Sequence, residues 1–190
     1  MDSRTLIRRF AVAAASFSLI GVGAVVAAGP AGATSATATL NAGSLAFVGA
    51  PPAVGFSATL NGTDQTPTTT QALDVGDATG SGAGWNITAT STTFTAGAKT
   101  LSTSATSVAS APSVACDASV TCTQATNSIT YPYALPAGTT APTATKLFNA
   151  AINTGMGNQT VTPTWKLAVP ANTYAGTYTS TWTLSLVSAP

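Results

Sequence analysis

The chain closes with the stretch that decides its fold, Thr177-Tyr178-Thr179-Ser180-Thr181-Trp182-Thr183-Leu184-Ser185-Leu186-Val187-Ser188-Ala189-Pro190. From residue 177 to residue 186 the side chains sort into two faces. One face consists of Tyr178, Ser180, Trp182, Leu184 and Leu186, and the other carries only hydroxyl groups. Successive side chains of a strand leave opposite sides of the backbone. This alternation therefore predicts a half-buried β-strand.

Short alternating segments of the same kind recur upstream, separated by Gly, Pro, Asn and Asp residues. The sequence predicts further strands at residues 36–40, 45–47, 54–60, 73–75, 85–90 and 160–169. The segment at 54–60 ends at Asn61-Gly62, a dipeptide typical of tight turns. Regularly spaced short strands predict an all-β protein, specifically a β-sandwich of short, mostly antiparallel strands.

The middle of the chain, about residues 100–157, lacks this regularity. It contains both cysteines and several prolines, and residues 145–152 are consistent with one or two helical turns. We interpret it as a long, irregular, disulfide-containing insertion between the strands of one domain, residues 34–190. Long structured loops on a rigid scaffold often carry binding sites.

The first 33 residues have the pattern of a secretory signal peptide. Arg4, Arg8 and Arg9 form a basic start, an apolar run covers residues 10–28, and Ala31-Gly32-Ala33 fits a cleavage site. Residues 1–33 are therefore predicted to be cleaved, with a retained anchor helix as the alternative. Cleavage would leave a secreted, extracellular protein without a stable membrane anchor.

The chain that remains after residue 33 carries few charges. They are Asp64, Asp74, Asp77, Asp117, Lys99, Lys146 and Lys166. Four negative and three positive groups give a net charge of −1. Because no basic patch is present to neutralise phosphates, nucleic acid is excluded as a partner. Nothing in the sequence calls for a cofactor.

The two cysteines, Cys116 and Cys122, lie close together in the sequence. In an exported chain a disulfide is the default for such a pair. Closing so short a loop is expected to stabilise the fold by roughly 2 kcal/mol. A metal site is the rival interpretation, but it needs four ligands, and the chain has no His and only Asp117 nearby. We therefore predict a disulfide and no metal.

All three tryptophans lie in similar triplets, Trp85-Asn86-Ile87, Trp165-Lys166-Leu167 and Trp182-Thr183-Leu184. The surrounding stretches are Leu73-Asp74-Val75-Gly76-Asp77, Gly82-Ala83-Gly84, Gly155-Met156-Gly157, Thr162-Pro163-Thr164 and Tyr174-Ala175-Gly176-Thr177-Tyr178. In this order they resemble the WxL-domain proteins of Gram-positive cell surfaces, over most of residues 34–190. The resemblance implies a secreted surface protein that attaches non-covalently to cell-wall peptidoglycan and takes part in complexes with other surface proteins.

The tryptophan triplets allow two interpretations. As structural residues, Trp165, Leu167, Trp182 and Leu184 pack into the core from the apolar faces of their strands. As binding residues, Trp85, Asn86 and Trp165 are the candidates, because an exposed indole offers an apolar face and an N–H donor for stacking on a sugar ring. Trp85 is the strongest of these candidates, because its glycine-rich approach places it near a loop.

Catalysis is difficult to build from this sequence. It contains no His and no Glu, so a Ser-His-Asp or Cys-His arrangement is not available. A glycosidase needs two facing carboxyl groups, and only four aspartates remain after residue 33. Asp74 and Asp77 lie next to a glycine, which is typical of turns; a calcium site that uses both carboxylates is the alternative. We therefore predict a non-enzymatic protein.

The sequence as a whole predicts a wall-attachment module. The alternative is a structural subunit of a surface filament or layer that is assembled by strand addition. This alternative rests on the Ala175-Gly176-Thr177-Tyr178 entry into a terminal alternating strand, because such a strand can pair with another chain at a sheet edge.

Overall fold

Strands make up all the regular secondary structure of residues 34–190, the residues that the computed structural model describes. The predicted signal peptide, residues 1–33, lies outside the described residues. Residues 34–39 are exposed and contain no strand, whereas residues 40–190 form a compact unit. Within the described part of the chain, no helix is long and apolar enough to cross a membrane.

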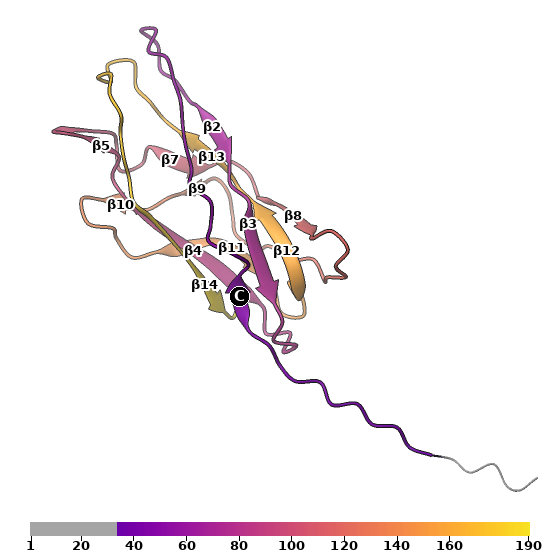
Figure 1. Cartoon of the computed structure of the whole chain (residues 1–190). Coiled ribbons are helices and arrows are strands. Elements are labelled where there is room, and N and C mark those ends of the chain that lie inside the picture. The colour runs from indigo at the N-terminus through magenta and orange to yellow at the C-terminus, as the bar shows by residue number, and fades with distance from the viewer. Residues whose placement is uncertain (1–33) are drawn as a thin grey trace, which may run out of the picture. The chain divides into compact units, whose positions relative to one another are not determined.

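The first layer of the unit consists of two short sheets, one of which continues the other along the chain. One has the order β1-β3-β12-β8, formed by Leu45–Phe47, Leu73–Asp77, Gly157–Thr162 and Ser113–Cys116. The other has the order β2-β13-β7-β9, formed by Thr68–Thr70, Thr164–Leu167, Thr106–Val108 and Tyr133–Ala134. Only Pro163 separates β12 from β13, and the Gln71 N–H bonds to its carbonyl at 3.1 Å. The second sheet thus continues the first (Figure 1).

The second layer is built around β4, the longest strand. Its elements are β4 (Trp85–Thr92), β14 (Trp182–Ser188), β11 (Thr145–Ala150) and β10 (Ala137–Gly138). β14 pairs antiparallel with one edge of β4, and β11 pairs antiparallel with the other edge. The short β10 pairs in parallel with the end of β4, beyond β11 on the same edge. A separate hairpin consists of β5 (Thr95–Ala96) and β6 (Lys99–Thr100). Apart from the β10–β4 pair, every pairing is antiparallel.

The hydrophobic core lies between these two layers. Alternate residues of β4, Trp85, Ile87 and Ala89, are buried against side chains of the opposite layer such as Val75 and Trp165. The apolar residues of β4 alternate as expected of a strand that turns one face to the core, and Asn86 and Thr90 on its other face are buried too. The predicted all-β sandwich of short, mostly antiparallel strands is therefore confirmed.

The central region is confirmed as disulfide-containing, because Cys116 and Cys122 are joined, with their Cα atoms 5.6 Å apart. It is also part of the sandwich, since it supplies β7, β8 and β11 to the sheets. The helical turns predicted at residues 145–152 are wrong. That segment forms β11, and a bulge between Lys146 and Phe148 leaves both Leu147 and Phe148 buried. Because the bulge breaks the alternation, the strand is not visible as a period-two pattern.

The strands predicted at residues 36–40 and 54–60 are not formed. Residues 36–40 are exposed, and Leu40 keeps 93% of its surface in solvent. At 54–60, Val54 and Phe56 pack partly against the core, but no strand pairs with the segment. A strand exists only where a neighbouring backbone completes its hydrogen-bond ladder, and alternation alone does not supply that neighbour.

Candidate binding site

Trp182 is the centre of an aromatic cluster that joins four separate parts of the chain. Its ring lies 4.7 Å from the Trp165 ring in an edge-to-face arrangement, measured between centroids. Phe94, just after β4, and Phe56, in the unpaired segment, lie 6.4 and 6.5 Å from it. Such pairs stabilise beyond the apolar area that they bury. The cluster therefore holds β14 and the unpaired segment over β13.

A buried amide extends this arrangement to the chain before Val54. The Trp165 indole N–H donates to Gln71 Oε1 at 2.9 Å, and Gln71 Nε2 donates to the Pro52 carbonyl at 2.7 Å. Gln71 is only 4% exposed. Both ends of its side chain are therefore satisfied, and they fix the position of residues 51–54 relative to β13.

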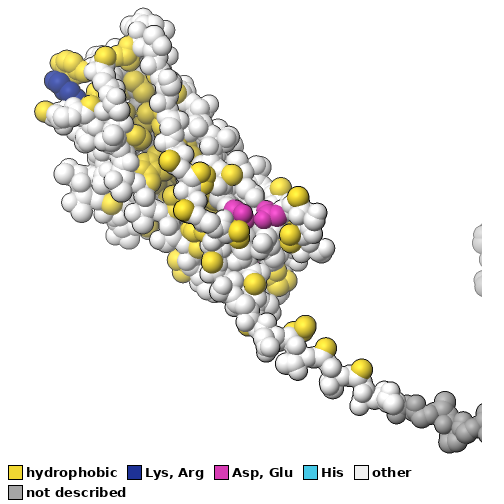
Figure 2. Space-filling model, viewed as in Figure 1, with side chains coloured by type: hydrophobic (Ala, Val, Ile, Leu, Met, Phe, Trp, Pro, Cys, Tyr) yellow, Lys and Arg dark blue, Asp and Glu magenta, His cyan; other side chains and the backbone are white. Residues whose placement is uncertain are grey.

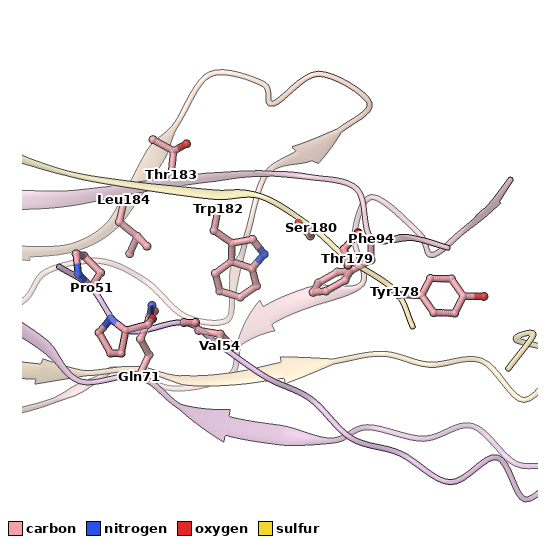
Figure 3. A pocket seen from close by; sticks show the side chains of 12 residues that line it. Pro51, Val54, Gln71, Phe94, Tyr178, Thr179, Ser180, Trp182, Thr183 and Leu184 are labelled. Carbon is pink, nitrogen blue, oxygen red and sulfur yellow. Dashed lines mark hydrogen bonds between the residues drawn. The ribbon is translucent and has the colours of Figure 1, made fainter. Parts of the chain in front are cut away.

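Two adjoining grooves lie between the unpaired segment and the last part of the chain. The β14 groove, about 570 Å³ in volume, runs between residues 51–54 and residues 178–184 (Figure 3). The tyrosine groove, about 640 Å³ in volume, runs between residues 54–60 and residues 173–178. They share Val54, Phe94 and Tyr178. Figure 2 shows apolar side chains gathered in a hollow on this face of the molecule.

The two grooves are polar without being charged. Apart from the apolar rings and aliphatic groups, their walls carry Ser and Thr hydroxyls, a Gln amide and Tyr phenols. At the outer end, the exposed Tyr174 ring lies under the Lys99 ammonium, with Nζ 3.8 Å from the ring centroid. This cation–π contact places the positive charge beside the tyrosine groove. The grooves are thus suited to ligands with hydroxyl and amide groups.

The predicted binding residues Trp85, Asn86 and Trp165 do not form this site. The Trp85 and Trp165 rings are both completely buried, in opposite layers of the sandwich. Trp85 donates its indole N–H to the Gly155 carbonyl at 2.9 Å, and a Cβ on Gly155 would lie 2.5 Å from that nitrogen. Neither ring offers an open face for stacking, because the opposite layer covers both.

Asn86 lies on the other face of β4 from Trp85. Its Nδ2 donates to the Ala189 carbonyl at 2.7 Å, and the residue is 5% exposed. This bond attaches the end of the chain to β4 just beyond β14. Asn86 therefore has a structural contact and no access to either groove.

The remaining motif residues, Leu167, Trp182 and Leu184, differ in burial. Leu167 is buried in a small second cluster with Leu101 and Val169. Trp182 and Leu184 are only half-buried: they pack against the main core and also line the β14 groove. The alternation of residues 177–186 places both side chains on its apolar face, but it does not predict the groove. The one feature of the sequence that points to the groove is the alternation at residues 54–60, a segment whose Phe56 packs against Trp182.

Asp74 and Asp77, the two carboxylates of the calcium alternative, make unrelated contacts. The pKa of Asp74 is raised, chiefly by burial and then by the negative charge and hydrogen bonding of the neighbouring Asp117. Asp117 accepts a hydrogen bond from the Thr160 hydroxyl at 3.0 Å. Asp77 instead accepts from the Thr79 N–H and hydroxyl, a local turn contact. Residues 34–190 contain no group of three or more side chains suited to hold a metal ion.

The described residues form an all-β sandwich with two uncharged grooves lined partly by aromatic rings. The family model described as "WxL domain surface cell wall-binding" matches residues 34–190, and the chain belongs to this family. Comparisons with curated proteins and with solved structures gave no match. The chain is thus a surface domain that associates with the cell wall.

Proposed function

We propose that this chain is secreted and stays at the cell surface through direct, non-covalent contacts with peptidoglycan, and that it catalyses no reaction. The tyrosine groove is the contact surface, and peptidoglycan is the wall polymer that its chemistry fits best. The observation that carries the proposal is the exposed Tyr174 ring with Lys99 beside it.

The chemistry of peptidoglycan matches this end of the groove. Its sugar rings present apolar C–H faces and hydroxyl or amide groups, and an aromatic ring supports such a face while nearby polar groups bond to its edge. Its stem peptides carry carboxylates, and Lys99 supplies a cation for them. Tyr178, whose hydroxyl donates to the Tyr174 carbonyl at 3.1 Å, fixes the position of the platform.

The absence of an enzyme activity is supported by the lining of the grooves. Glycan cleavage needs a pair of carboxyl groups across the bond, and no Asp lines either groove. Asp74 and Asp117 adjoin each other on another part of the sandwich. A bound glycan would therefore be held without an acid or base beside it.

Sedimentation with purified cell walls tests the contact surface. We expect Tyr174→Ala and Lys99→Ala each to reduce the bound fraction severalfold, with an unchanged melting temperature, because both side chains are exposed. Digesting the peptidoglycan first should abolish sedimentation. Lys146→Ala and Ile152→Ala are matched controls for charge and exposed apolar surface, and both should bind normally. Normal binding by the Tyr174 and Lys99 variants would refute the proposed surface.

Export is tested separately on secreted material. Signal cleavage after Ala33 should give an N-terminus at Thr34 in intact-mass measurements. A mature protein that begins at Met1 would contradict the secreted assignment and leave the anchor-helix alternative.

The filament or layer subunit remains a second candidate because one observation favours it. No strand among residues 34–190 is hydrogen-bonded to the outer edge of β14. An unpaired edge of this kind is what strand addition requires.

A further inference from the structure

β14 has one paired edge and one unpaired edge. The Thr181 carbonyl accepts a hydrogen bond from the Thr92 N–H, and the Ala189 N–H donates to the Gly84 carbonyl. The backbone N–H and C=O groups of the odd-numbered residues therefore point toward β4. Backbone groups alternate in direction along a strand. The N–H and C=O groups of Ser180, Trp182, Leu184 and Leu186 therefore point away from β4, and no backbone group of residues 34–190 bonds to them.

The opposite wall of the β14 groove, residues 51–54, is not a strand: Pro51 and Pro52 have no backbone N–H, and the Pro52 carbonyl accepts a hydrogen bond from Gln71. Ala53 and Val54, the rest of this wall, make no backbone–backbone hydrogen bond to any described residue. Gln71 fixes the start of this wall through Pro52, so the wall does not depend on strand pairing for its position. Figure 3 shows Trp182 and Leu184 on one side of the groove, facing Val54 on the other. The unpaired edge of β14, with apolar side chains beside it and a fixed wall opposite, is a geometry that can accept an added strand.

The segment that best matches this vacancy is residues 34–42 of the chain itself. It reads Thr34-Ser35-Ala36-Thr37-Ala38-Thr39-Leu40-Asn41-Ala42, so Ala36, Ala38 and Leu40 alternate with polar residues. Every one of these nine residues is exposed, and Leu40, at 93%, is the most exposed large hydrophobic side chain of the described residues. The segment has a strand pattern and no strand partner.

The charge and size of the segment also fit the groove. Neither the segment nor the lining of the β14 groove contains a charged side chain, so burying one against the other leaves no charge without a partner. Ala36 and Ala38 are small, which allows a close approach to the β14 backbone, and Leu40 supplies apolar volume beside Phe94 and Trp182. An added strand gains affinity from its backbone bonds and specificity from alternate side chains.

We propose that the β14 groove binds residues 34–42 of a second copy of the chain as an added β-strand. The backbone of that segment pairs with the outer edge of β14, and its Ala36, Ala38 and Leu40 side chains enter the groove. Each copy provides one segment and one groove, so the contact is head-to-tail and extends into chains of copies. This contact does not depend on the proposed wall surface at Tyr174 and Lys99.

The size of the purified protein as a function of concentration tests this assembly in the absence of cell walls. We expect concentration-dependent oligomers. Leu40→Asp should weaken association by at least about tenfold, because burying a leucine side chain is worth roughly tenfold to a hundredfold in an equilibrium constant. Thr39→Asp introduces the same charge one position earlier, on the face that points away from the groove, and should still assemble. Monomers at all concentrations, or equal effects of the two substitutions, would overturn the proposal.

Amide hydrogen exchange identifies the edge that is used. The N–H groups of Ser180, Trp182, Leu184 and Leu186 should gain protection as the concentration rises, and should lose it in Leu40→Asp. Oligomers in which these four amides stay unprotected, or protection that persists in the dilute monomer, would refute an intermolecular strand at this edge. Because Leu40→Asp leaves Tyr174 and Lys99 intact, its monomer should still sediment with cell walls, whereas Tyr174→Ala should assemble normally. The two proposals can therefore fail independently.

Discussion

Trp85 and Trp182 begin similar triplets, yet they lie in different surroundings. Trp85 opens the central strand β4, which has a neighbour on each edge and the opposite layer above it, and its ring is fully buried. Trp182 opens β14, which is hydrogen-bonded to another strand on one edge only, and its ring is half-buried and lines a groove. The triplet determines which face a tryptophan occupies. The place of its strand in the sheet determines how deeply the ring is buried.

The largest effect is expected for Trp85→Ala. Removing this ring eliminates its packing on Phe148, 5.8 Å away between centroids, and its hydrogen bond to Gly155. Truncating a buried tryptophan costs about 3–5 kcal/mol, a large part of the roughly 5–15 kcal/mol that stabilise a typical domain. Denaturant unfolding measures the loss. A variant of unchanged stability that no longer binds cell walls would show that Trp85 is a binding residue after all.

Trp182→Ala sharpens the comparison. We expect a smaller loss of about 1–3 kcal/mol, because part of the ring already faces the β14 groove and less apolar surface is lost from the core. The variant should also assemble less well, since the floor of the groove is removed. Parallel measurements of unfolding and oligomer size separate the two effects. Equal destabilisation by Trp85→Ala and Trp182→Ala would contradict the difference in burial.

Loss of the disulfide should have a moderate and local effect. Replacing Cys116 and Cys122 by Ser should cost roughly 2 kcal/mol, because the unfolded chain gains freedom when the short loop opens. The Trp182 cluster contains no residue of this loop, so Trp182 should keep its surroundings and fluorescence. Before substitution, the unreduced protein should weigh about 2 Da less than the reduced form, because bridging removes two hydrogens.

The smallest effect concerns pH. The pKa of Asp74 is raised above its usual value of 3.8 in the folded protein, so the folded state binds this proton more tightly than the unfolded state. The contribution of Asp74 to the free energy of unfolding is therefore fully present below pH 3.8. It is lost as the pH rises through the raised pKa of the folded protein. Asp74→Asn should flatten this part of the stability profile, measured by denaturant midpoints at several pH values. Asp64→Asn, far from Asp117 in the sequence, is the matched control.

Several features could be predicted from alternation and spacing alone. The strands predicted at 45–47, 73–75 and 85–90 follow from period-two patterns between turn residues, because a half-buried strand requires that pattern. The closing strand predicted over 177–186 forms only from Trp182 to Ser188, since residues 177–181 make no continuous ladder. The ordered tryptophan triplets identified the family, and the cysteine spacing predicted the disulfide. These features depend on residues that are close in the sequence.

Other features required the folded structure. The segment at 54–60 has a strand pattern without a partner, whereas β11 has a partner and hides its pattern behind a bulge. The sequence by itself determined which faces of the strands are apolar, because side-chain direction follows from local backbone geometry. Only the tertiary structure decided that Trp85 is enclosed and that Trp182 borders an open groove. Burial depends on which distant backbones lie alongside a strand, and local alternation contains no record of those neighbours.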